Sequence, residues 1–309
     1  MSENGADFLM SLPSPLRLRL ARLRAAIWRL RTLPFAESLF AGVPAGTRLA
    51  RPFAGGTLTV DVGRSSTERL LWLEGERAIA ERHLLARGVS PGDRVLDVGA
   101  NLGYYALLFA RAIGPGGNID CFEPEPQNIE TLAGNVRTNR LEESVRVHPV
   151  AVGEKAGSVR LDPGLNGVVT EFGALEVPVR RLDDLDQLHD RPVDFLKIDI
   201  EGYEGPALRG AARILARDRP ALFVEIHPEL IGPPDDVPGI VATLRALYPG
   251  LEAWEPATGT LIARLAARYF PSRAVRRIGD LDALVAACAR GERREPFWAI
   301  APRGPRRGD

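Results

Sequence analysis

From residue 94 onward, short apolar runs alternate with longer segments in which apolar residues recur every three or four positions. The short runs predict strands and the longer segments predict helices. The predicted strands are 94–98, 118–122, 145–150, 193–199 and 220–226. The predicted helices are 104–112, 126–139 and 205–216. Runs such as "RVLDV" and "ALFVEI" are apolar almost throughout, as a parallel sheet covered on both faces requires. The pattern therefore predicts a doubly wound, Rossmann-like α/β fold.

The pattern also predicts how the chain is organised around this domain. Residues 46–66 alternate and contain paired glycines, which is typical of a small β hairpin or a linker. An amphipathic helix over 67–87 then leads into the first strand, so we place the main domain at 67–302. After the fifth strand we expect a helix near 237–248 and a final pair of strands at the sheet edge. Residues 303–309 are rich in Gly, Pro and Arg and predict a disordered tail.

Residues 1–45 contain a basic amphipathic segment that predicts a helix. Its apolar residues follow a helical period, and they are Leu16, Leu20, Leu23, Ile27 and Leu30. Arginines interrupt the segment repeatedly, so it lacks the apolar middle of a secretory signal. We expect residues 14–35 to pack against the body of the protein or a partner subunit. Contact with an anionic membrane surface is the alternative.

Composition narrows the class of protein. The 309 residues are 45% hydrophobic and 26% charged, which is ordinary for a soluble globular chain. Lysines plus arginines equal acids at 40 each, so no overall positive charge indicates a nucleic-acid partner. Cys121 and Cys288 have no paired spacing, which argues against a disulfide framework or a zinc site. We expect a cytoplasmic protein, free or peripheral to the inner face of a membrane.

The segment "VLDVGANLGYYALLFA" is a strand, a glycine turn and a helix, the arrangement that brings a nucleotide-like ligand to a helix N-terminus. Gly99 and Gly103 lie four apart with Asn101 between them, which departs from the G-x-G-x-x-G dinucleotide pattern. Asp97 precedes the turn, and a carboxylate there would repel a pyrophosphate but favour a sulfonium or an ammonium. S-adenosylmethionine is a ligand of that kind.

Glu123 ends the next predicted strand, about 20 residues after the turn. At that spacing an acid binds ribose hydroxyls in doubly wound folds. A solvated acid at a strand end is the alternative. Together with Asp97 and the glycine turn, Glu123 favours a cofactor site.

The sequence resembles the FkbM-type methyltransferases, a family within the class I S-adenosylmethionine-dependent superfamily. The resemblance covers roughly residues 68–302. It rests on the ordered blocks "PGDRVLDVGANLGYYALLFAR", "GPGGNIDCFEPEPQN", "LAGNVRTN", "VAVGEKAGSVRL", "VRRLDDL", "FLKIDIEGYEGPALRGA" and "LFVEIHPEL". The N-terminal arginine–leucine segment lies outside it.

The resemblance implies a mostly parallel sheet of seven strands whose last strand is antiparallel. It also implies methyl transfer from S-adenosylmethionine, often to a hydroxyl of a sugar, a glycan or a secondary metabolite. Matched block by block, Asp97, Gly99, Asn101 and Gly103 correspond to the cofactor loop and Glu123 to the ribose acid. Ala151 and Val152 fall where the loop after the third strand usually meets adenine.

Acidic residues gather at the end of the fourth predicted strand, where open α/β sheets bind ligands. Lys197, Asp199 and Glu201 are spaced by two and share one face if the extended conformation continues. Glu225 and His227 share a face of the next strand. A buried Lys197 requires an acidic partner, and Glu225 or Asp199 could supply it.

Methylation of a hydroxyl requires loss of its proton, so these residues are candidates for catalysis. Asp199 is the first candidate for orienting or deprotonating the acceptor, and Glu201, Glu225 and a neutral His227 are the others. Alternatively, these groups are structural, with Glu201 and Glu204 favouring the start of the following helix. Asp199, Glu225 and His227 could also hold Mg²⁺ or Mn²⁺, but the spacing does not favour a metal.

The sequence leaves rival functions open. N-methylation of a small amine would use the same fold. An NAD-dependent oxidoreductase is disfavoured by Asp97 and by the missing middle glycine, and a non-catalytic S-adenosylmethionine-binding partner protein is a third reading. We expect the segment 157–177 and the loop 228–238 to cover a small-molecule or glycan acceptor.

Overall fold

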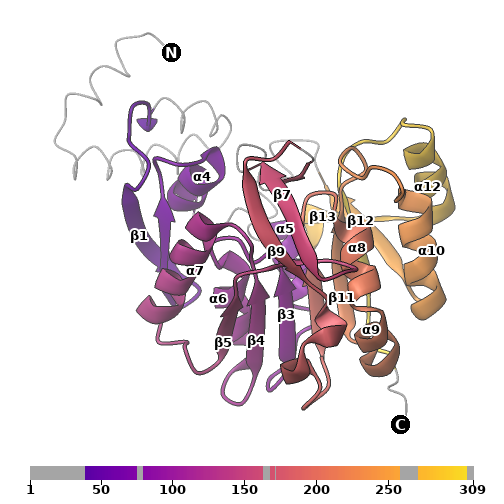
Figure 1. The fold of residues 1–309 in the computed structure, drawn as a ribbon, viewed down its shortest axis with the longest axis horizontal. Coiled ribbons are helices and arrows are strands. Elements are labelled where there is room, and N and C mark those ends of the chain that lie inside the picture. Colours follow the sequence, from indigo (N-terminus) through magenta and orange to yellow (C-terminus); the bar gives the residue numbers. More distant parts are fainter. Residues whose placement is uncertain (1–38, 75–78, 163–167, 171, 258–270, 305–309) are drawn as a thin grey trace. The chain divides into compact units, whose positions relative to one another are not determined.

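The computed structural model describes residues 39–74, 79–162, 168–170, 172–257 and 271–304 (Figure 1). The chain divides into two compact units, Met1–Ile79 and Ala80–Asp309. The predicted N-terminal helix of residues 14–35 and the end of the predicted tail lie outside the described residues. In the described part of the chain, no helix is both long enough and apolar enough to cross a membrane.

The described part of the first unit is a hairpin with one helix. Strands β1 (Arg48–Phe53) and β2 (Gly56–Asp61) pair antiparallel, and Ala54 and Gly55 both have positive φ, as a tight hairpin turn requires. Helix α4 (Ser66–Glu74) belongs with the hairpin, because the Asp61 amide donates a hydrogen bond to the buried carboxylate of Glu68. The sequence pattern placed this helix in the main domain instead, beginning at residue 67.

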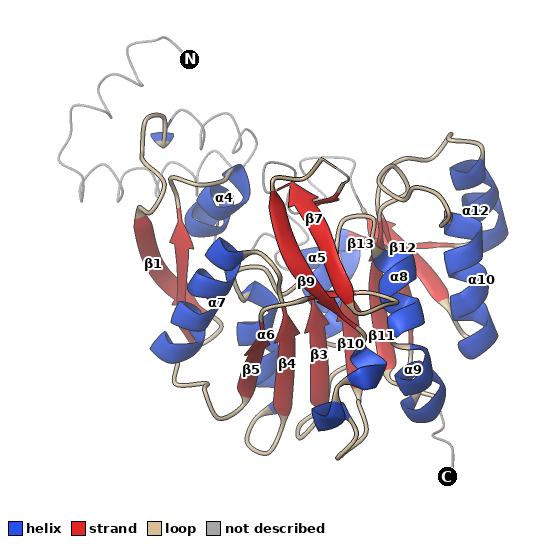
Figure 2. Ribbon diagram, in the orientation of Figure 1, coloured by secondary structure: helices blue, strands red, loops and turns tan. Residues whose placement is uncertain are grey.

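The second unit is built on one large sheet. Its strands are β3 (Arg94–Val98), β4 (Asn118–Phe122), β5 (Val145–His148), β10 (Phe195–Ile198), β11 (Ala221–Ile226), β12 (Glu252–Pro256), β13 (Val275–Ile278) and β14 (Phe297–Ala301). The strand order is β13-β12-β14-β11-β10-β3-β4-β5 (Figure 2). The five strands from β11 to β5 are parallel, and β14 runs antiparallel between β11 and β12.

The predicted fold class is therefore confirmed, including the antiparallel last strand. Strand β13 at the edge adds an eighth strand that the sequence pattern did not predict. All five residues of β3 are buried, as expected for a central strand with helices on both faces. The order reverses at β3, which places the carboxyl ends of β3 and β10 on either side of the topological switch point.

Helices cover the two faces of this sheet with separate apolar cores. The helices of one face are α5 (Ile79–Leu85), α6 (Tyr104–Ile113) and α7 (Pro126–Thr138). Those of the other face are α8 (Glu204–Gly210), α9 (Ala212–Asp218), α10 (Val237–Leu247) and α12 (Leu281–Ala289). Leu96 and Val95 illustrate the division, since they follow each other in β3 and point into different cores.

The sequence predicted one helix over 205–216, and the structure has two, α8 and α9. The break follows from Asp183, a fully buried residue of the short 3₁₀ helix Leu182–Asp184. Its carboxylate accepts hydrogen bonds from the backbone amides of Arg213 and Ile214, at 2.9 and 3.0 Å. These are amides that the first turn of a helix leaves without partners, so Asp183 caps α9 from a distant part of the chain.

A second, four-stranded sheet occupies part of the region that we expected to cover the acceptor. Its strands are β6 (Ala151–Val152), β7 (Gly157–Asp162), β8 (Val168–Val169) and β9 (Leu175–Arg180), in the order β6-β9-β7-β8. The sheet meets α8, since a Cβ atom on Gly210 would lie 2.1 Å from the carbonyl oxygen of Gly153. The side chains of β9 alternate between buried and exposed, as in a strand with one solvated face.

Candidate active site

The glycine turn between β3 and α6 is held in a conformation that requires glycine. Gly99 has φ +79°, and a Cβ atom there would lie 1.9 Å from the carbonyl oxygen of Asp199. Gly103 has φ +90°, and its Cβ atom would meet the Leu132 side chain at 2.6 Å. Asn101, between them, also has positive φ. The turn therefore brings backbone close to the end of β10 and leaves no room for side chains at the two glycines.

Glu123, at the end of the neighbouring strand, stabilises this turn by hydrogen bonds. Its buried carboxylate accepts hydrogen bonds from the Asn101 amide at 2.8 Å, the Glu125 amide at 2.9 Å and the Asn128 side chain at 3.1 Å. Burial raises the pKa of Glu123, and these donors oppose that effect. A carboxylate has about four lone-pair sites, so Glu123 keeps acceptor capacity for a ligand hydroxyl next to the glycine turn.

Lys197 lies at the centre of the charges beneath the turn. Its ammonium is 3.0 Å from Oδ1 of Asp97, 3.2 Å from the Gly99 carbonyl oxygen and 3.8 Å from Oδ2 of Asp199. Burial by itself lowers the pKa of Lys197, but the charges of Asp97 and Asp199 outweigh it and raise the pKa to about 12. Lys197 is therefore a buried cation at neutral pH.

Of the two partners expected for Lys197, Asp199 lies within ion-pair distance, while the expected pairing with Glu225 of β11 gives way to Asp97. Lys197 is opposite Asp97 in the register of β10 and β3, so the nearest carboxylate comes from the first strand. Asp97 consequently shares its charge with Lys197 and does not present an isolated negative charge to the crevice. Oδ2 of Asp97 is buried and has no hydrogen-bond partner in the described structure, which leaves an acceptor atom next to the turn.

The extended conformation does not continue through Glu201, contrary to expectation. Strand β10 ends at Ile198, and Glu201 has φ +51° in the turn before α8, a conformation that costs about 1–3 kcal/mol in a residue other than glycine. This turn moves Glu201 off the strand face and toward His227. Oε2 of Glu201 lies 3.4 Å from Nε2 of His227.

Glu204 is the first residue of α8, as the sequence suggested, but it also has a second role. It is fully buried, and Oε1 of its carboxylate lies 2.8 Å from Nδ1 of His227 while accepting the Gly202 amide at 3.0 Å. The sequence indicates only the charge at the start of the helix and not the contact with His227. The positive φ angles of Glu201 and Gly202 turn the chain so that Glu204 points inward, and only the identity of Gly202 hinted at this in the sequence.

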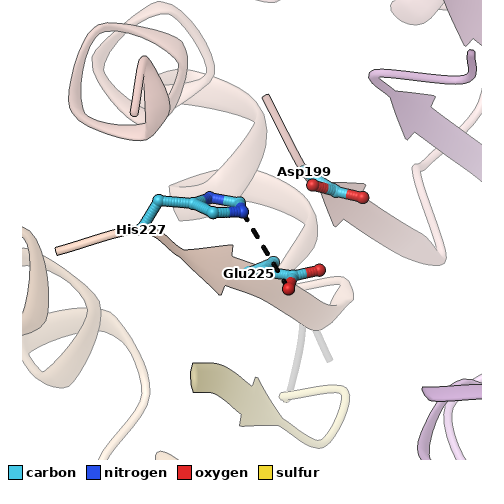
Figure 3. A group of neighbouring side chains, drawn as sticks. All are labelled: Asp199, Glu225 and His227. Atoms are coloured by element: carbon cyan, nitrogen blue, oxygen red, sulfur yellow. Dashed lines mark ion pairs between the residues drawn. The ribbon is translucent and has the colours of Figure 1, made fainter. Parts of the chain in front are cut away.

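Asp199, Glu225 and His227 converge at the carboxyl ends of β10 and β11 (Figure 3). One ligand-type atom from each lies within 4.8 Å of the others. Nε2 of His227 is 3.9 Å from Oε1 of Glu225. Burial, reinforced by the charge of Asp199, raises the pKa of Glu225. The structure thus brings together three of the candidate residues, Asp199, Glu225 and His227.

His227 is protonated at neutral pH in this environment. Burial alone lowers its pKa, but the hydrogen bond and charge of Glu204, with the charges of Asp199 and Glu201, raise it to about 9. The expectation of a neutral His227 acting as a base is therefore not met. Its imidazole is held between carboxylates on both ring nitrogens.

Ala151 and Val152, the predicted adenine contacts, form β6 after the carboxyl end of β5. The side chains of both residues are buried in apolar cores. A contact with a ligand would therefore come from their backbone or from the adjoining loop. The assignment of these two residues to the cofactor stays a prediction.

Residues 97–247, which include the glycine turn, Glu123 and the whole acidic cluster, match the family model described as the methyltransferase FkbM domain. The chain contains a methyltransferase domain of the FkbM family. The match begins at Asp97 in β3 and extends to Leu247 at the end of α10.

Two curated methyltransferases are similar to this chain in sequence. The 31-O-demethyl-FK506 methyltransferase FkbM of Streptomyces tacrolimicus is 40% identical over 83 residues, which is 26% of this chain and 31% of that protein. Methyltransferase sdnD of Sordaria araneosa is 27% identical over 155 residues, covering 38% of this chain and 59% of that protein. The matches thus span less than two thirds of either relative.

A solved structure of methyltransferase FkbM from Methylobacillus flagellatus KT is also similar. It is 20% identical, with 62% of this chain and 50% of that chain covered and a TM-score of 0.39. A likeness of this strength supports no conclusion about the site. The geometry of the chain itself and the family match therefore carry the functional argument.

Proposed function

We propose that this protein transfers a methyl group from S-adenosylmethionine to a hydroxyl of a sugar, a glycan or a secondary metabolite. The observation that carries the proposal is the position of Asp199. Its backbone oxygen touches the glycine turn, and its carboxylate is 26% exposed at the end of β10. The cofactor loop and an accessible acid therefore adjoin at the carboxyl edge of the sheet, where ligands bind in this fold class.

The residues at the turn fit an adenosyl cofactor. Gly99 and Gly103 leave the backbone uncovered, Glu123 has acceptor capacity for ribose hydroxyls, and Oδ2 of Asp97 is a buried acceptor without a partner. When bound, S-adenosylmethionine supplies the methyl group on its sulfonium sulfur, and the sulfur keeps the electron pair of the broken bond. The protein has to bind the acceptor in line with that methyl group and remove its hydroxyl proton.

Asp199 is the residue that we assign to the acceptor oxygen. In the described structure no side chain or amide donates a hydrogen bond to its carboxylate, and its nearest cation is Lys197 at 3.8 Å. An acceptor hydroxyl can therefore donate to a carboxylate oxygen of Asp199, and this oxygen takes the proton as the hydroxyl is methylated. Lys197 fixes the carboxylate from the buried side.

His227 and Glu201 border the same space and are assigned to binding the acceptor. A protonated His227 donates hydrogen bonds, so through Nε2 it can bind an oxygen of a polyhydroxylated acceptor. Glu201, with a 29% exposed side chain, can accept from a neighbouring hydroxyl. A set of closely spaced donors and acceptors of this kind suits a sugar better than an apolar ring.

The decisive test is to incubate the purified protein with labelled S-adenosylmethionine and a fractionated extract of its source cells. Mass spectrometry of the labelled product then identifies the methylated atom. We expect an O-methylated small molecule or glycan. Labelled product on nitrogen would favour the amine alternative, and absence of transfer to any fraction would leave a non-catalytic cofactor-binding protein.

Replacing Asp199 tests its role directly. With the identified acceptor, Asp199→Asn should lower kcat by about 10²- to 10⁴-fold, the range of general acid–base catalysis, without changing affinity for S-adenosylmethionine. Asp184→Asn is the matched control, since Asp184 is an exposed acid paired with Arg213 outside the site. An Asp199→Asn protein that binds the cofactor and keeps full turnover would remove Asp199 from the mechanism.

A further inference from the structure

The convergence of Asp199, Glu225 and His227 has a second chemical consequence. The two carboxylates and the imidazole come from neighbouring strands and point at a common space (Figure 3). In an octahedral site with bonds of about 2.1 Å, ligand atoms on opposite sides of the metal lie about 4.2 Å apart. At most one pair among three ligands can lie opposite each other, and adjacent ligand atoms lie about 3.0 Å apart. The spread of these atoms, up to 4.8 Å, therefore closes to a coordination geometry after a movement of about 1 Å by each side chain.

His227 is held in the orientation that a metal ligand needs. Its side chain is 8% exposed, and Nδ1 is fixed by the buried carboxylate of Glu204. Metal-binding histidines commonly donate one ring nitrogen to a carboxylate while the other binds the metal. Nε2 of His227 points into the cluster, where within the described chain it has carboxylates at 3.4 and 3.9 Å but no hydrogen bond.

The two carboxylates have charged neighbours, Lys197 at 3.8 Å from Asp199 and His227 at 3.9 Å from Glu225, but no hydrogen-bond donors among the described residues. Among the residues that the structure describes, none donates a hydrogen bond to the carboxylate of Asp199 or Glu225. Lys197 is the neighbouring cation, but its ammonium is closer to Asp97 than to Asp199. Two partly buried carboxylates that face each other repel, and a cation between them relieves this repulsion, as a proton bound to one of them also does.

We propose that Asp199, Glu225 and His227 bind one divalent cation, with Glu204 as the residue that orients His227. Two carboxylate oxygens and one imidazole nitrogen suit Mn²⁺ better than Mg²⁺, since Mg²⁺ prefers oxygen ligands alone. Binding of the cation displaces the Nε2 proton of His227, so that the cation takes over the contact with the acceptor that the protonated imidazole makes in its absence. A cation there lowers the pKa of a hydroxyl that binds to it, while the second oxygen of Asp199 still accepts the proton.

The catalytic role of the cation rests on the proposed methyl transfer. Binding of the cation is independent of it. The test is therefore a binding measurement. The full-length protein is freed of metals with EDTA, dialysed and titrated with Mn²⁺, and free Mn²⁺ is measured by electron paramagnetic resonance. Pulsed measurements on the bound Mn²⁺ detect coupling to a ¹⁴N nucleus of an imidazole ligand.

We expect one bound Mn²⁺ per chain with ¹⁴N coupling. Glu225→Gln should weaken binding by at least tenfold, and His227→Gln should also abolish the nitrogen coupling. Glu204→Gln should keep the coupling but weaken binding by about 10- to 100-fold, the usual effect of changing a residue behind a ligand. Glu252→Gln is the matched control, because it alters an acid of the same sheet that pairs with Arg277 outside the cluster.

Absence of bound Mn²⁺ at about 1 mM, the weak end of the range for divalent sites, overturns the proposal. Bound Mn²⁺ without ¹⁴N coupling, or with an affinity that Glu225→Gln leaves unchanged, overturns it as well. S-adenosylmethionine affinity, measured separately on each variant, shows whether the domain is folded. Methyl transfer that persists in EDTA would contradict the cation's role in catalysis but would agree with the proposed methyl transfer. A nitrogen-coupled Mn²⁺ site in a protein that transfers no methyl group would support the cation site and contradict the proposed function.

Discussion

At the scale of single residues, Lys197 organises the charges of the site. It is fully buried, and its ammonium contacts Asp97, the Gly99 carbonyl oxygen and the Tyr105 ring, whose centroid is 4.9 Å away. The ion pair links the two strands on either side of the switch point and fixes the turn above them. A buried pair of this kind is strongly destabilised when one partner is removed, because the other charge is left uncompensated.

Replacing Lys197 therefore has a defined effect on stability. Lys197→Met should lower the free energy of unfolding by about 3–5 kcal/mol, and Asp97→Leu in the same chain should restore most of the loss. Urea denaturation followed by circular dichroism measures both. A loss below about 1 kcal/mol for Lys197→Met, as for an exposed pair, would contradict the buried ion pair.

The sequence identified Lys197 as a buried residue and Asp199 as one possible partner, but it did not identify Asp97, the nearest carboxylate. Lysine in an apolar strand indicates that a carboxylate is near, since an unpaired interior charge is costly. Which carboxylate it meets depends on the register of β10 with β3 and on the side-chain rotamers. The spacing of residues in the sequence specifies neither the register nor the rotamers, so it could not favour Asp97 over Glu225.

At the scale of elements, the glycine turn and the end of β10 form one structural unit. Two independent features require glycine at position 99. Its φ is positive, and the Asp199 carbonyl oxygen lies where a side chain would begin. Gly92 offers a matched comparison, with φ +82° and nothing within 4 Å of a Cβ atom. Substitutions at these two glycines therefore distinguish the free-energy cost of a positive φ from the cost of steric overlap with Asp199.

Alanine at these two positions should therefore differ in effect. Gly92→Ala should cost only the conformational strain of about 1–3 kcal/mol and leave cofactor binding unchanged. Gly99→Ala should cost a further 1–3 kcal/mol or so from the overlap and should weaken S-adenosylmethionine binding. Urea denaturation and calorimetric titration report the two effects. Equal losses and equal affinities in both variants would show that the close approach to Asp199 has no consequence.

Elements with strong local patterns were predicted well, and elements set by distant contacts were not. The bounds of β3 and β4 agree with the prediction, because their apolar runs end at glycines, a proline or charged residues. The break between α8 and α9 was missed because its cause, the carboxylate of Asp183, lies some 30 residues earlier in the chain. The turn at Glu201 was missed because a positive φ is uncommon outside glycine.

At the scale of the whole domain, the arrangement of the large sheet explains why the site is where it is. Strands β3, β4, β10 and β11 run parallel, so their carboxyl ends bring together residues that are far apart in the sequence. The fold class and the cofactor loop could be predicted because strand periodicity and glycine spacing are local signals. The role of Glu204 and the second sheet could not, since they depend on how segments pack.

The central claim is that the turn at Gly99 and Gly103, with Glu123 behind it, binds S-adenosylmethionine and not a dinucleotide. Calorimetric titration of the purified full-length protein with S-adenosylmethionine, and separately with NAD, tests this claim most directly. The structure and the FkbM domain match predict saturable binding of one S-adenosylmethionine per chain and no heat of binding with NAD. Saturable binding of NAD without binding of S-adenosylmethionine would contradict the account.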